Sequence, residues 1–379
     1  MKLAQITEGT TELIVPRASL ESQVPPTDPV FFNPAAGANR DVSVAVTSAL
    51  GGERFCDALA GVGARGIRVA KEAAEGIEVT MVDFNREALK LAAKSAKSNG
   101  VGSRCDFVAQ EARTYLHSRY GRGDKFDYVD IDPFGSPAPF FQAMVSAIAN
   151  GGVVSVTATD TAALCGVYPS VSLRRYGALS LNSRFHHETA ARILLNAVRA
   201  HAATFERGII PVAAHSTRHY IRVYAKIEDG ASKADASLKD VGYVSICSRC
   251  SDMTASARPP GACEKCGGRE RGAGPLWIGR LTNDELGRLI SASSRKDLPS
   301  ARRILEPLVG VDGFPPWSFS LEETCSSLRV ASVPEDEVRE ALGERGFRSL
   351  KQPFEKTGLK TDAAYADVLE AVKQVSRLH

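Results

Sequence analysis

Short apolar runs alternate with amphipathic stretches over residues 54–158. The apolar runs predict strands at 54–58, 78–83, 104–109, 126–131 and 152–158. Apolar positions spaced three and four residues apart predict helices at 65–75, 86–98 and 139–149. Asn99-Gly100, after the second of these helices, is a typical helix stop. Strands and helices in this alternation predict an α/β domain with a doubly wound parallel sheet.

The end of this block has a different pattern. Residues 188–202 predict a helix with Ile193 and Val198 on its apolar face. Strands at 209–215 and 220–227 follow. Because the linker between them is too short for a crossover helix, the two strands should be antiparallel. A mostly parallel sheet that finishes in an antiparallel hairpin is typical of the class I, Rossmann-like methyltransferase fold, and a dehydrogenase sheet does not end in this way.

The flanking segments are less regular. Prolines at 25, 26, 29 and 34 predict a non-helical lead-in before a helix at 41–50. The small polar and charged residues at 229–239 indicate a linker. Helical patterns return after Leu276, at 282–292, 321–328, 332–343 and 362–376, and Ser332 with Glu335 makes a Ser-x-x-Glu capping box. These boundaries predict an α/β domain at 1–240, a cysteine-rich segment at 241–275 and a smaller, mostly helical α+β domain at 276–379.

The composition excludes some classes of protein. A chain of 379 residues with 44% hydrophobic and 24% charged residues is typical of a globular protein. It has no apolar run long enough for a membrane span and no signal-peptide pattern, so we expect a cytoplasmic protein. The net charge of +3 does not indicate nucleic acid, but residues 161–226 hold nine Lys/Arg and two acids. This excess is either a phosphate-binding surface or an ordinary solvated surface.

Residues 57–66, Asp-Ala-Leu-Ala-Gly-Val-Gly-Ala-Arg-Gly, lie between a predicted strand and a predicted helix. Gly61 and Gly63 let the backbone turn tightly and approach a ligand that faces the next helix. Asp83 ends the following strand, where a carboxylate can accept both hydroxyls of a ribose. NAD sites share the glycines, but Asp57 suits the cationic methionine end of S-adenosylmethionine and would repel a pyrophosphate. The segment indicates a site for this cofactor, and the alternative is a tight turn without a ligand.

The segment Asp132-Pro133-Phe134 follows a predicted strand and resembles the (Asp/Asn)-Pro-Pro-(Tyr/Phe) signature of enzymes that methylate exocyclic amines. The lone pair of such an amine is delocalised into the ring, so the nitrogen attacks poorly. The Asp132 carboxylate and the Pro133 carbonyl can accept its N–H groups and offset the positive charge that develops. Phe134 can stack on an extruded base. The alternative is a simple Pro-Gly turn, and the position after a cofactor loop favours catalysis.

Two Cys-x-x-Cys pairs form the strongest metal signal in the chain. Four thiolates at this spacing match tetrahedral Zn²⁺, and a site closed by four protein ligands is structural. The predicted ligands are Cys247, Cys250, Cys263 and Cys266. The other cysteines, at 56, 105, 165 and 325, are predicted to be buried free thiols.

Together these features resemble the tRNA (guanine-N2)-dimethyltransferases of archaea and eukaryotes, which methylate the amino group of guanosine 26. The matching residues run from end to end of the chain. They are Glu8-Gly9, residues 30–34, Asn39-Arg40-Asp41, residues 57–66, Asp83, residues 132–137, the four paired cysteines and residues 357–362.

The resemblance implies roles for particular residues. It implies S-adenosylmethionine contacts at Arg40, Arg65, Asp83 and the pair Glu111-Ala112, where the family usually has Asp-Ala. It implies a catalytic carboxylate at Asp132, and aromatic walls of the guanine pocket at Phe32 and Phe134. The implied partner is tRNA, and no protein partner is implied.

Three other readings stay open at this point: a non-catalytic nucleic-acid-binding protein with a zinc ribbon and a winged-helix-like tail, a nicotinamide dehydrogenase, and a DNA amino-methyltransferase. The cofactor residues disfavour the first, and the Asp-Pro-Phe segment and terminal hairpin disfavour the second. A substrate assay separates the third. The sequence leaves open the modified nucleotides, the number of methyl groups added, the oligomeric state and the tRNA-binding surface.

Overall fold

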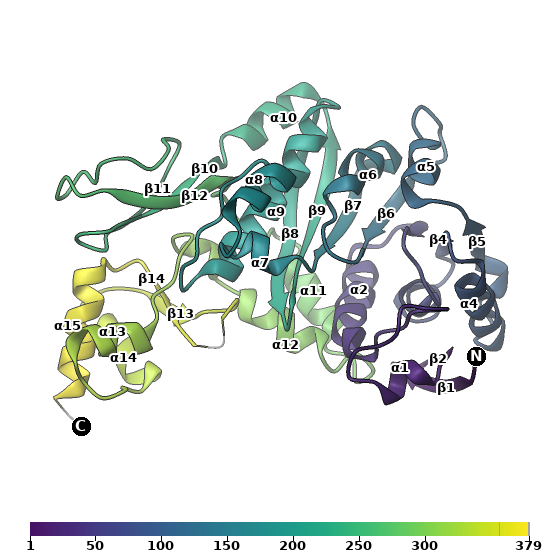
Figure 1. Cartoon of the computed structure of the whole chain (residues 1–379), viewed down its shortest axis with the longest axis horizontal. Coiled ribbons are helices and arrows are strands. Elements are labelled where there is room, and N and C mark those ends of the chain that lie inside the picture. Colours follow the sequence, from purple (N-terminus) through teal and green to yellow (C-terminus); the bar gives the residue numbers. More distant parts are fainter. Residues whose placement is uncertain (356, 378–379) are drawn as a thin grey trace.

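The computed structural model describes residues 1–355 and 357–377. Seven strands in these residues form the central sheet, which lies in the middle and right of Figure 1. Their order across the sheet is β5 (Cys105–Ala109), β4 (Glu78–Asp83), β3 (Arg54–Asp57), β6 (Phe126–Ile131), β7 (Ile148–Ala158), β9 (Tyr220–Asp229) and β8 (Arg207–Thr217). The first five strands are parallel, whereas β9 is antiparallel to both β7 and β8. The predicted class I sheet with its terminal antiparallel hairpin is confirmed.

Helices cover the sheet in two groups whose members contact one another. One group is α2 (Gly37–Leu50), α3 (Ala64–Arg68), its π-helical continuation at Val69–Ala73, and α4 (Arg86–Ser98). The other group is α5 (Ala112–His117), α6 (Phe141–Ala147) and α9 (His186–Ala203). The short helices α7 (Thr161–Leu164) and α8 (Pro169–Tyr176) connect β7 to α9. This doubly wound arrangement places the ends of β3, β4 and β6 at one edge, where the loops of an α/β site gather.

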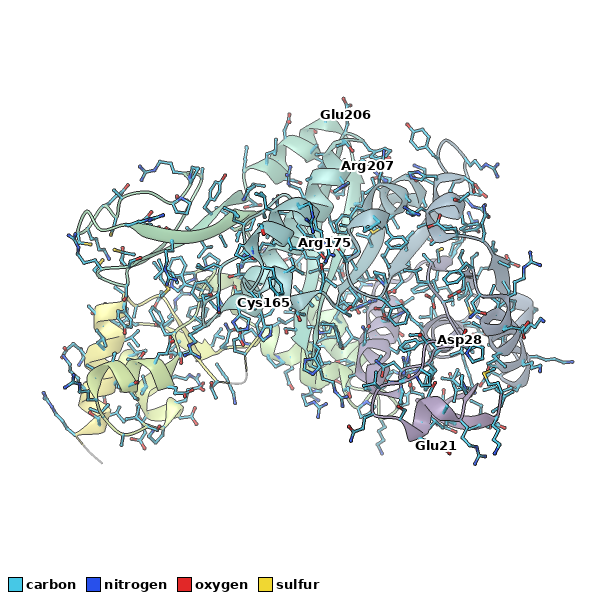
Figure 2. All side chains as sticks on the ribbon, in the orientation of Figure 1. Glu21, Asp28, Cys165, Arg175, Glu206 and Arg207 are labelled. Atoms are coloured by element: carbon cyan, nitrogen blue, oxygen red, sulfur yellow. The ribbon has the colours of Figure 1, made fainter. Side chains whose placement is uncertain are left out.

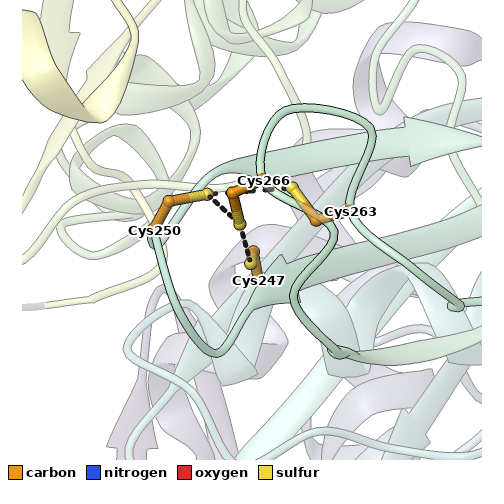
Figure 3. Close-up of side chains that lie close together, drawn as sticks. All are labelled: Cys247, Cys250, Cys263 and Cys266. Carbon is orange, nitrogen blue, oxygen red and sulfur yellow. Dashed lines mark hydrogen bonds between the residues drawn. The ribbon is translucent and has the colours of Figure 1, made fainter.

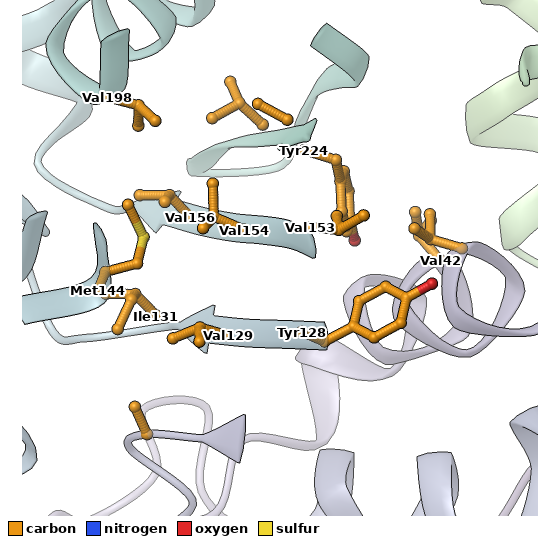
Figure 4. Packing of buried hydrophobic residues seen from close by; sticks show 14 of the residues in the cluster. Val42, Tyr128, Val129, Ile131, Met144, Val153, Val154, Val156, Val198 and Tyr224 are labelled. Atoms are coloured by element: carbon orange, nitrogen blue, oxygen red, sulfur yellow. The ribbon is translucent and has the colours of Figure 1, made fainter. Parts of the chain in front are cut away.

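The core lies on both faces of the central strands. Figure 4 shows Ile131 of β6 beside Met144 of α6, and Tyr128 of the same strand beside Val42 of α2. All four side chains are buried. Burial on both faces explains why apolar residues stand next to each other in these strands, as in Tyr128-Val129 of β6 and Val153-Val154 of β7.

The first residues form a hairpin that the sequence pattern did not predict. Strands β1 (Leu3–Glu8) and β2 (Thr11–Pro16) pair antiparallel before the short helix α1 (Ala18–Glu21). The hairpin packs on α4 through the Ile14 N–H, which donates to Ser95 Oγ at 2.9 Å. The prolines that indicated an irregular lead-in all lie after this hairpin, and α2 begins at Gly37 rather than at residue 41.

The second half of the chain adds two smaller units. Strands β10 (Val241–Cys247), β11 (Met253–Ser256) and β12 (Glu270–Trp277) form a sheet in the order β11-β10-β12. Helices α11 (Leu286–Ser293) and α12 (Ala301–Leu305) pack against α2 and share the main core. A separate core joins α13 (Leu321–Leu328), α14 (Glu335–Glu344) and α15 (Tyr365–Ser376) to the hairpin of β13 (Ser349–Lys351) and β14 (Leu359–Thr361).

Two local predictions are wrong. The segment 229–239 is not an irregular linker, because Ala231–Leu238 forms helix α10 on β8. The predicted capping box at Ser332 and Glu335 does not form either. Helix α14 begins at Glu335 itself, with Pro334 as its N-cap residue and no side-chain cap. Proline fixes its own backbone in a conformation that suits a helix entry, so it sets the start of α14 in place of the serine.

A fully buried ion pair attaches the last unit, which consists of α13 to α15 with β13 and β14, to the α/β domain. Lys360 Nζ lies 2.9 Å from Glu188 Oε2 at the start of α9, and both side chains are fully buried. Lys360 also donates to the carbonyl oxygens of Pro315 and Trp317, at 2.7 and 3.1 Å. Arg192 contacts the same carboxylate one helical turn later, at 2.9 Å. Removing one partner would leave an uncompensated buried charge, which typically costs several kcal/mol, so this contact fixes the last unit on α9.

A second buried network attaches the N-terminal hairpin to α2 and α3. The guanidinium of Arg68 is fully buried and contacts Glu8, Asp41 and Glu72 at 2.8, 2.8 and 2.9 Å. Glu72 also accepts the Thr10 N–H at 3.0 Å. The turn that closes the hairpin must pass directly over this network. Gly9 does so with φ of +60°, and a Cβ there would lie 2.6 Å from Arg68 Nη2 and from both carboxylate oxygens of Glu72.

We expect Gly9→Ala to lower the free energy of unfolding by about 2–5 kcal/mol, because it combines left-handed strain with a steric clash. Gly76→Ala is the matched control, since Gly76 has φ of +86° and no atom within 4 Å of its added Cβ. This control should lose only the strain component, about 1–2 kcal/mol. Chemical denaturation of both variants measures the difference, and equal losses would show that the network does not require glycine.

Candidate active site

The glycine-rich loop and Asp83 contact each other at the ends of β3 and β4. Gly63 has φ of +74°, and a Cβ there would lie 2.7 Å from Ala92 and 2.8 Å from Met81, so only glycine fits. Asp83 Oδ2 accepts the Gly61 N–H at 2.7 Å, and Asp83 Oδ1 accepts the Asn85 N–H at 2.8 Å. The structure therefore brings together the glycines and the carboxylate that the sequence assigned to one cofactor site.

Asp57 lies at the end of β3 under the same loop. Its carboxylate is buried and accepts the Gly66 N–H at 3.1 Å. Burial, and after it the nearby charge of Asp130, raises the pKa of Asp57 to about 7, against the opposing effect of Arg65. Asp57 can therefore change its charge near neutral pH, and a cation bound beside it would favour the ionised form.

Arg65, at the start of α3, joins the cofactor loop to the Asp-Pro-Phe segment. Its Nη2 donates to Asp132 Oδ2, and its Nε lies 3.1 Å from Asp130 Oδ1. Its Nη1 donates to the side-chain oxygen of Asn39 at 2.9 Å. Arg65 is buried, whereas the Asp132 side chain is 25% exposed. The guanidinium of Arg65 thus orients the Asp132 carboxylate, while the buried Asp130 carboxylate neutralises the charge of Arg65.

Asp130 and Arg222 belong to this arrangement and were missed in the sequence. Both side chains are fully buried and form an ion pair between β6 and β9. Ser155 donates to Asp130 at 2.5 Å, and Arg222 donates to Tyr224 and Thr157 at 2.7 and 2.5 Å. Burial alone would raise the pKa of Asp130, but Arg222 and Arg65 outweigh it and lower that pKa.

A charged residue inside each of two apolar strands was the available signal for this pair. Such a residue requires a buried partner, although the sequence does not say which.

The loop at 132–137 is held by hydrogen bonds at Gly135 and Ser136. Gly135 takes φ of +77°, donates its N–H to Thr159 Oγ1 at 2.7 Å and accepts the Thr159 N–H at 2.9 Å. Ser136 Oγ lies 2.8 Å from Tyr176 OH, which donates to Asp160 at 2.6 Å. Phe134 nevertheless stays 68% exposed. A rigid loop therefore presents one aromatic ring to solvent next to Asp132.

The segment at 29–33 lies over the cofactor loop and reaches the catalytic loop. Asn85 Nδ2 donates to the Pro29 carbonyl at 2.7 Å, and a Cβ on Gly61 would lie 3.7 Å from the Phe31 carbonyl. The rings of Phe31 and Phe134 meet edge to face with centroids 4.6 Å apart. Phe31 is thus a second aromatic at this position that the sequence analysis missed, although it adjoins a residue that was named.

Phe32, the predicted base-pocket wall, has a different environment. It is only 3% exposed, and the guanidinium of Arg40 lies 5.2 Å above its ring. Arg40 in turn makes two hydrogen bonds to the Glu8 carboxylate, at 2.6 and 2.5 Å. In this structure Phe32 turns into the packing, and Arg40 of α2 lies against its ring and is buried with it.

Glu111 and Ala112 begin helix α5 after β5. Glu111 acts as the N-cap, since its Oε2 accepts the Thr114 N–H at 2.9 Å and its Oε1 accepts Arg113 Nε at 2.7 Å. Although partial burial opposes them, these hydrogen bonds lower the pKa of Glu111 to about 2. Phe84, which follows Asp83, is 79% exposed and is another aromatic that the sequence analysis did not single out.

The basic excess at 161–226 is mostly not a continuous surface. In the described structure Arg192, Arg199, Arg207 and Arg222 are buried. Most members of the group have acidic partners, among them Arg175 with Asp160, Arg184 with Glu323, Arg207 with Asp229 and Lys226 with Glu285. A large part of this excess serves packing, so the phosphate-surface interpretation keeps only the exposed Arg174, Arg175, Arg184 and Arg218.

The four paired cysteines converge at one end of the β10–β12 sheet (Figure 3). Their Sγ atoms lie 3.5 Å apart for Cys247 and Cys266, 3.7 Å for Cys250 and Cys263, and 3.5 Å for Cys250 and Cys266. A tetrahedral Zn²⁺ with Zn–S bonds of about 2.3 Å separates its sulfurs by about 3.8 Å. The cluster therefore fits a closed zinc site and could hold the ion without rearrangement.

All eight cysteines, which all lie in the described part of the chain, are free. The scattered ones at 56, 105, 165 and 325 are buried, as predicted. Across the described residues, no helix has the length and apolarity needed to cross a membrane.

Comparison with known proteins identifies the family of this chain. Residues 9–373 match the family model for N2,N2-dimethylguanosine tRNA methyltransferase. A tRNA (guanine(26)-N(2))-dimethyltransferase of Methanopyrus kandleri is 36% identical over 96% of this chain and 95% of its own length. One from Methanosarcina mazei is 33% identical over 98% of both chains.

A solved structure extends the similarity to three dimensions. The complex of Trm1 from Pyrococcus horikoshii with S-adenosyl-L-methionine superposes with a TM-score of 0.84 and 28% identity, over 97% of this chain and 99% of that one. The family match spans nearly the whole sequence, and the structural match spans the sheet, the cysteine-rich segment and the last unit. The chain belongs to the N2,N2-dimethylguanosine tRNA methyltransferase family.

Proposed function

We propose that this chain transfers methyl groups from S-adenosylmethionine to the exocyclic N2 of guanosine 26 in tRNA, twice, to give N2,N2-dimethylguanosine. The observation that carries the proposal is the Arg65 bridge, which couples the cofactor loop to Asp132. The names of the relatives support the substrate, the position and the two additions. A DNA amino-methyltransferase needs the same carboxylate chemistry, and assay of tRNA against DNA with labelled cofactor tests the choice.

The proposed chemistry follows from how Asp132 is held. Arg65 binds Oδ2 of Asp132, so we assign Oδ1 and the Pro133 carbonyl to the two N–H groups of the guanine amine. The nitrogen attacks the methyl carbon, the bond from that carbon to sulfur breaks, and S-adenosylhomocysteine leaves. The amine then carries an excess proton, which Asp132 stabilises and accepts.

The base and the cofactor are proposed to lie on opposite sides of this carboxylate. Phe134, with Phe31 against its edge, offers a stacking surface for a guanine taken out of its helix. Phe32 and Arg40 support that wall from below through their stacked contact. S-adenosylmethionine would bind its ribose at Asp83, its adenine near Phe84, Glu111 and Ala112, and its cationic end beside Asp57. Gly61 and Gly63 let the backbone approach it.

We propose that the last unit binds tRNA. The domain boundaries at 1–240, 241–275 and 276–379 stay a prediction. The packing supports a boundary later than residue 276, because residues 281–308 contribute to the main core. A-form RNA offers a protein mainly its shape, phosphates and 2′-hydroxyls, which suits the exposed arginines and the helices α13 to α15. We also propose that the enzyme acts in the cytoplasm, since free thiols are typical of a reducing compartment.

Asp132→Asn should lower turnover about 10²–10³-fold, because it removes the charge that stabilises the methylated amine. Binding of S-adenosylmethionine should be nearly unchanged, since Asp130 still neutralises Arg65. Asp106→Asn on the exposed surface of β5 is the control and should keep wild-type turnover. Single-turnover methyl transfer to unmodified tRNA measures the effect. Near wild-type rates in the Asp132 variant would remove this carboxylate from the mechanism.

The affinity for S-adenosylmethionine should rise with pH between about 6 and 8. Below its pKa of about 7, Asp57 is protonated and must lose a proton to face the cationic cofactor. Affinity should therefore fall by up to about tenfold per pH unit on the acid side. For the cofactor-free protein the raised pKa has the opposite effect. Stability falls as pH rises from about 4 to about 7, because the carboxyl ionises in the unfolded chain while buried Asp57 still holds its proton.

Calorimetric titration across this pH range provides the measurement. Asp57→Asn should bind more weakly and lose the pH dependence, whereas Asp83→Asn should bind more weakly and keep it. A flat wild-type profile, or an unchanged slope in Asp57→Asn, would contradict the assignment of Asp57.

Cys263→Ser should release one equivalent of zinc per chain and lower the thermal midpoint, because the metal stabilises only the folded cluster. Cys105→Ser, at a buried cysteine outside any metal-ligating group of the described residues, should keep the metal. Elemental analysis of both purified proteins decides the matter. Wild-type protein without zinc at this site would refute it.

A further inference from the structure

A second group of metal-ligating side chains lies about the start of α9, separate from the four-cysteine cluster. One ring nitrogen each from His186 and His187 and the Sγ of Cys165 all lie within 4.8 Å of one another. Cys165 follows α7, and Figure 2 labels it near the centre of the molecule, between the α/β domain and the last unit. None of these three residues has a role in the methyl transfer described above.

The hydrogen bonds of the two histidines assign the donor nitrogen of each ring. His186 Nδ1 lies 2.5 Å from the carbonyl oxygen of Ser183, and a carbonyl can only accept. His187 Nδ1 lies 2.7 Å from Oε2 of Glu355, which is a carboxylate. Nδ1 is therefore the donor nitrogen of each ring, so that Nε2 is the nitrogen whose lone pair a metal can take. This is the form in which imidazole binds a metal.

The same contacts match the outer shell of known metal sites. A metal-bound histidine almost always donates its other N–H to a carboxylate or a backbone carbonyl, and here one ring uses each kind. Glu355 is further fixed because its Oε1 accepts the His187 backbone N–H at 3.2 Å. The two rings are 4.3 Å apart between centroids. Both rings are oriented by residues that are not metal ligands themselves. This feature distinguishes Cys165, His186 and His187 from three polar residues that are merely adjacent.

We propose that Cys165, His186 and His187 form a second zinc site, with Glu355 as the positioning residue. One thiolate and two imidazoles suit Zn²⁺, and three protein ligands leave a fourth position for water. Ligand atoms bound to one zinc would lie roughly 3.3–3.6 Å apart. Side-chain rotations that move the ligand atoms by about 1 Å therefore complete the site. His186 also lines a cavity of about 560 Å³, together with residues of β10 to β12 and of the last unit.

The position of the site indicates what the metal would do. Cys165 belongs to the connection after β7, the histidines begin α9, and Glu355 lies in the last unit between β13 and β14. Glu188, which follows His187 in α9, forms the buried ion pair with Lys360. A metal here would hold the start of α9 and, through Glu355, the same interface that Lys360 holds. The inference does not depend on the proposed methyl transfer.

Metal content of the full-length chain tests the proposal. Wild-type protein stripped with a chelator and reloaded with Zn²⁺ should hold two equivalents, with competition against a chelating indicator to exclude weak binding. Cys165→Ser and Cys263→Ser should each hold one, because they remove different sites. Cys325→Ser changes a buried cysteine outside both groups and should hold two. One equivalent in the wild type, or two in Cys165→Ser, would overturn the proposal.

Spectroscopy keeps the test decisive if a variant is unstable. In Cys263→Ser loaded with Co²⁺, the thiolate-to-metal absorption of the remaining site should have roughly a quarter of the intensity of a four-thiolate site, in line with one sulfur ligand. Glu355→Gln keeps every ligand but weakens the orienting hydrogen bond, so Co²⁺ affinity in that background should fall about 10–100-fold. No thiolate absorption, or an affinity that Glu355→Gln leaves unchanged, would contradict the assignment.

Discussion

The buried contact of Asp130 with Arg222 and Arg65 is the constraint on which the site depends. It joins three parts of the fold, namely the parallel strand β6, the antiparallel strand β9 and the helix after the cofactor loop. Each charge is buried, so none can turn to solvent if a partner is lost, and breaking such a group typically costs about 3–5 kcal/mol. The terminal hairpin of the sheet is therefore required by the active site, since it supplies the arginine that compensates Asp130.

The position of Asp132 follows from this contact. Asp132 is two residues after Asp130, and Arg65 contacts both carboxylates. The partly exposed Asp132 side chain is thus held by a guanidinium that the buried Asp130 already fixes. Burial, with the charges of Asp130 and Asp132 after it, raises the pKa of Asp57. One set of charges accounts both for the orientation of Asp132 and for the raised pKa of Asp57.

A comparable arrangement holds the last unit at the start of α9. Three consecutive residues each meet a different partner, since His186 contacts Ser183, His187 contacts Glu355 and Glu188 contacts Lys360. Two of these partners come from the last unit. The α/β domain and that unit are therefore connected by buried polar contacts, and a metal at the histidines would strengthen this connection.

The sequence by itself determined the parallel strands, the terminal hairpin and the cysteine cluster, because these depend on local periodicity and spacing. Its motifs also carried the resemblance to the family. It also indicated the glycine loop with Asp83. Only the tertiary structure decided the rest. The Asp130–Arg222 pair joins residues far apart in the chain, and a one-dimensional pattern does not encode which buried charge meets which. The same holds for the four buried arginines of the basic run and for the Cys165 group. The hairpin around Gly9 was missed for a similar reason, since its packing on α4 and Arg68 stabilises two short strands that local propensity alone leaves marginal.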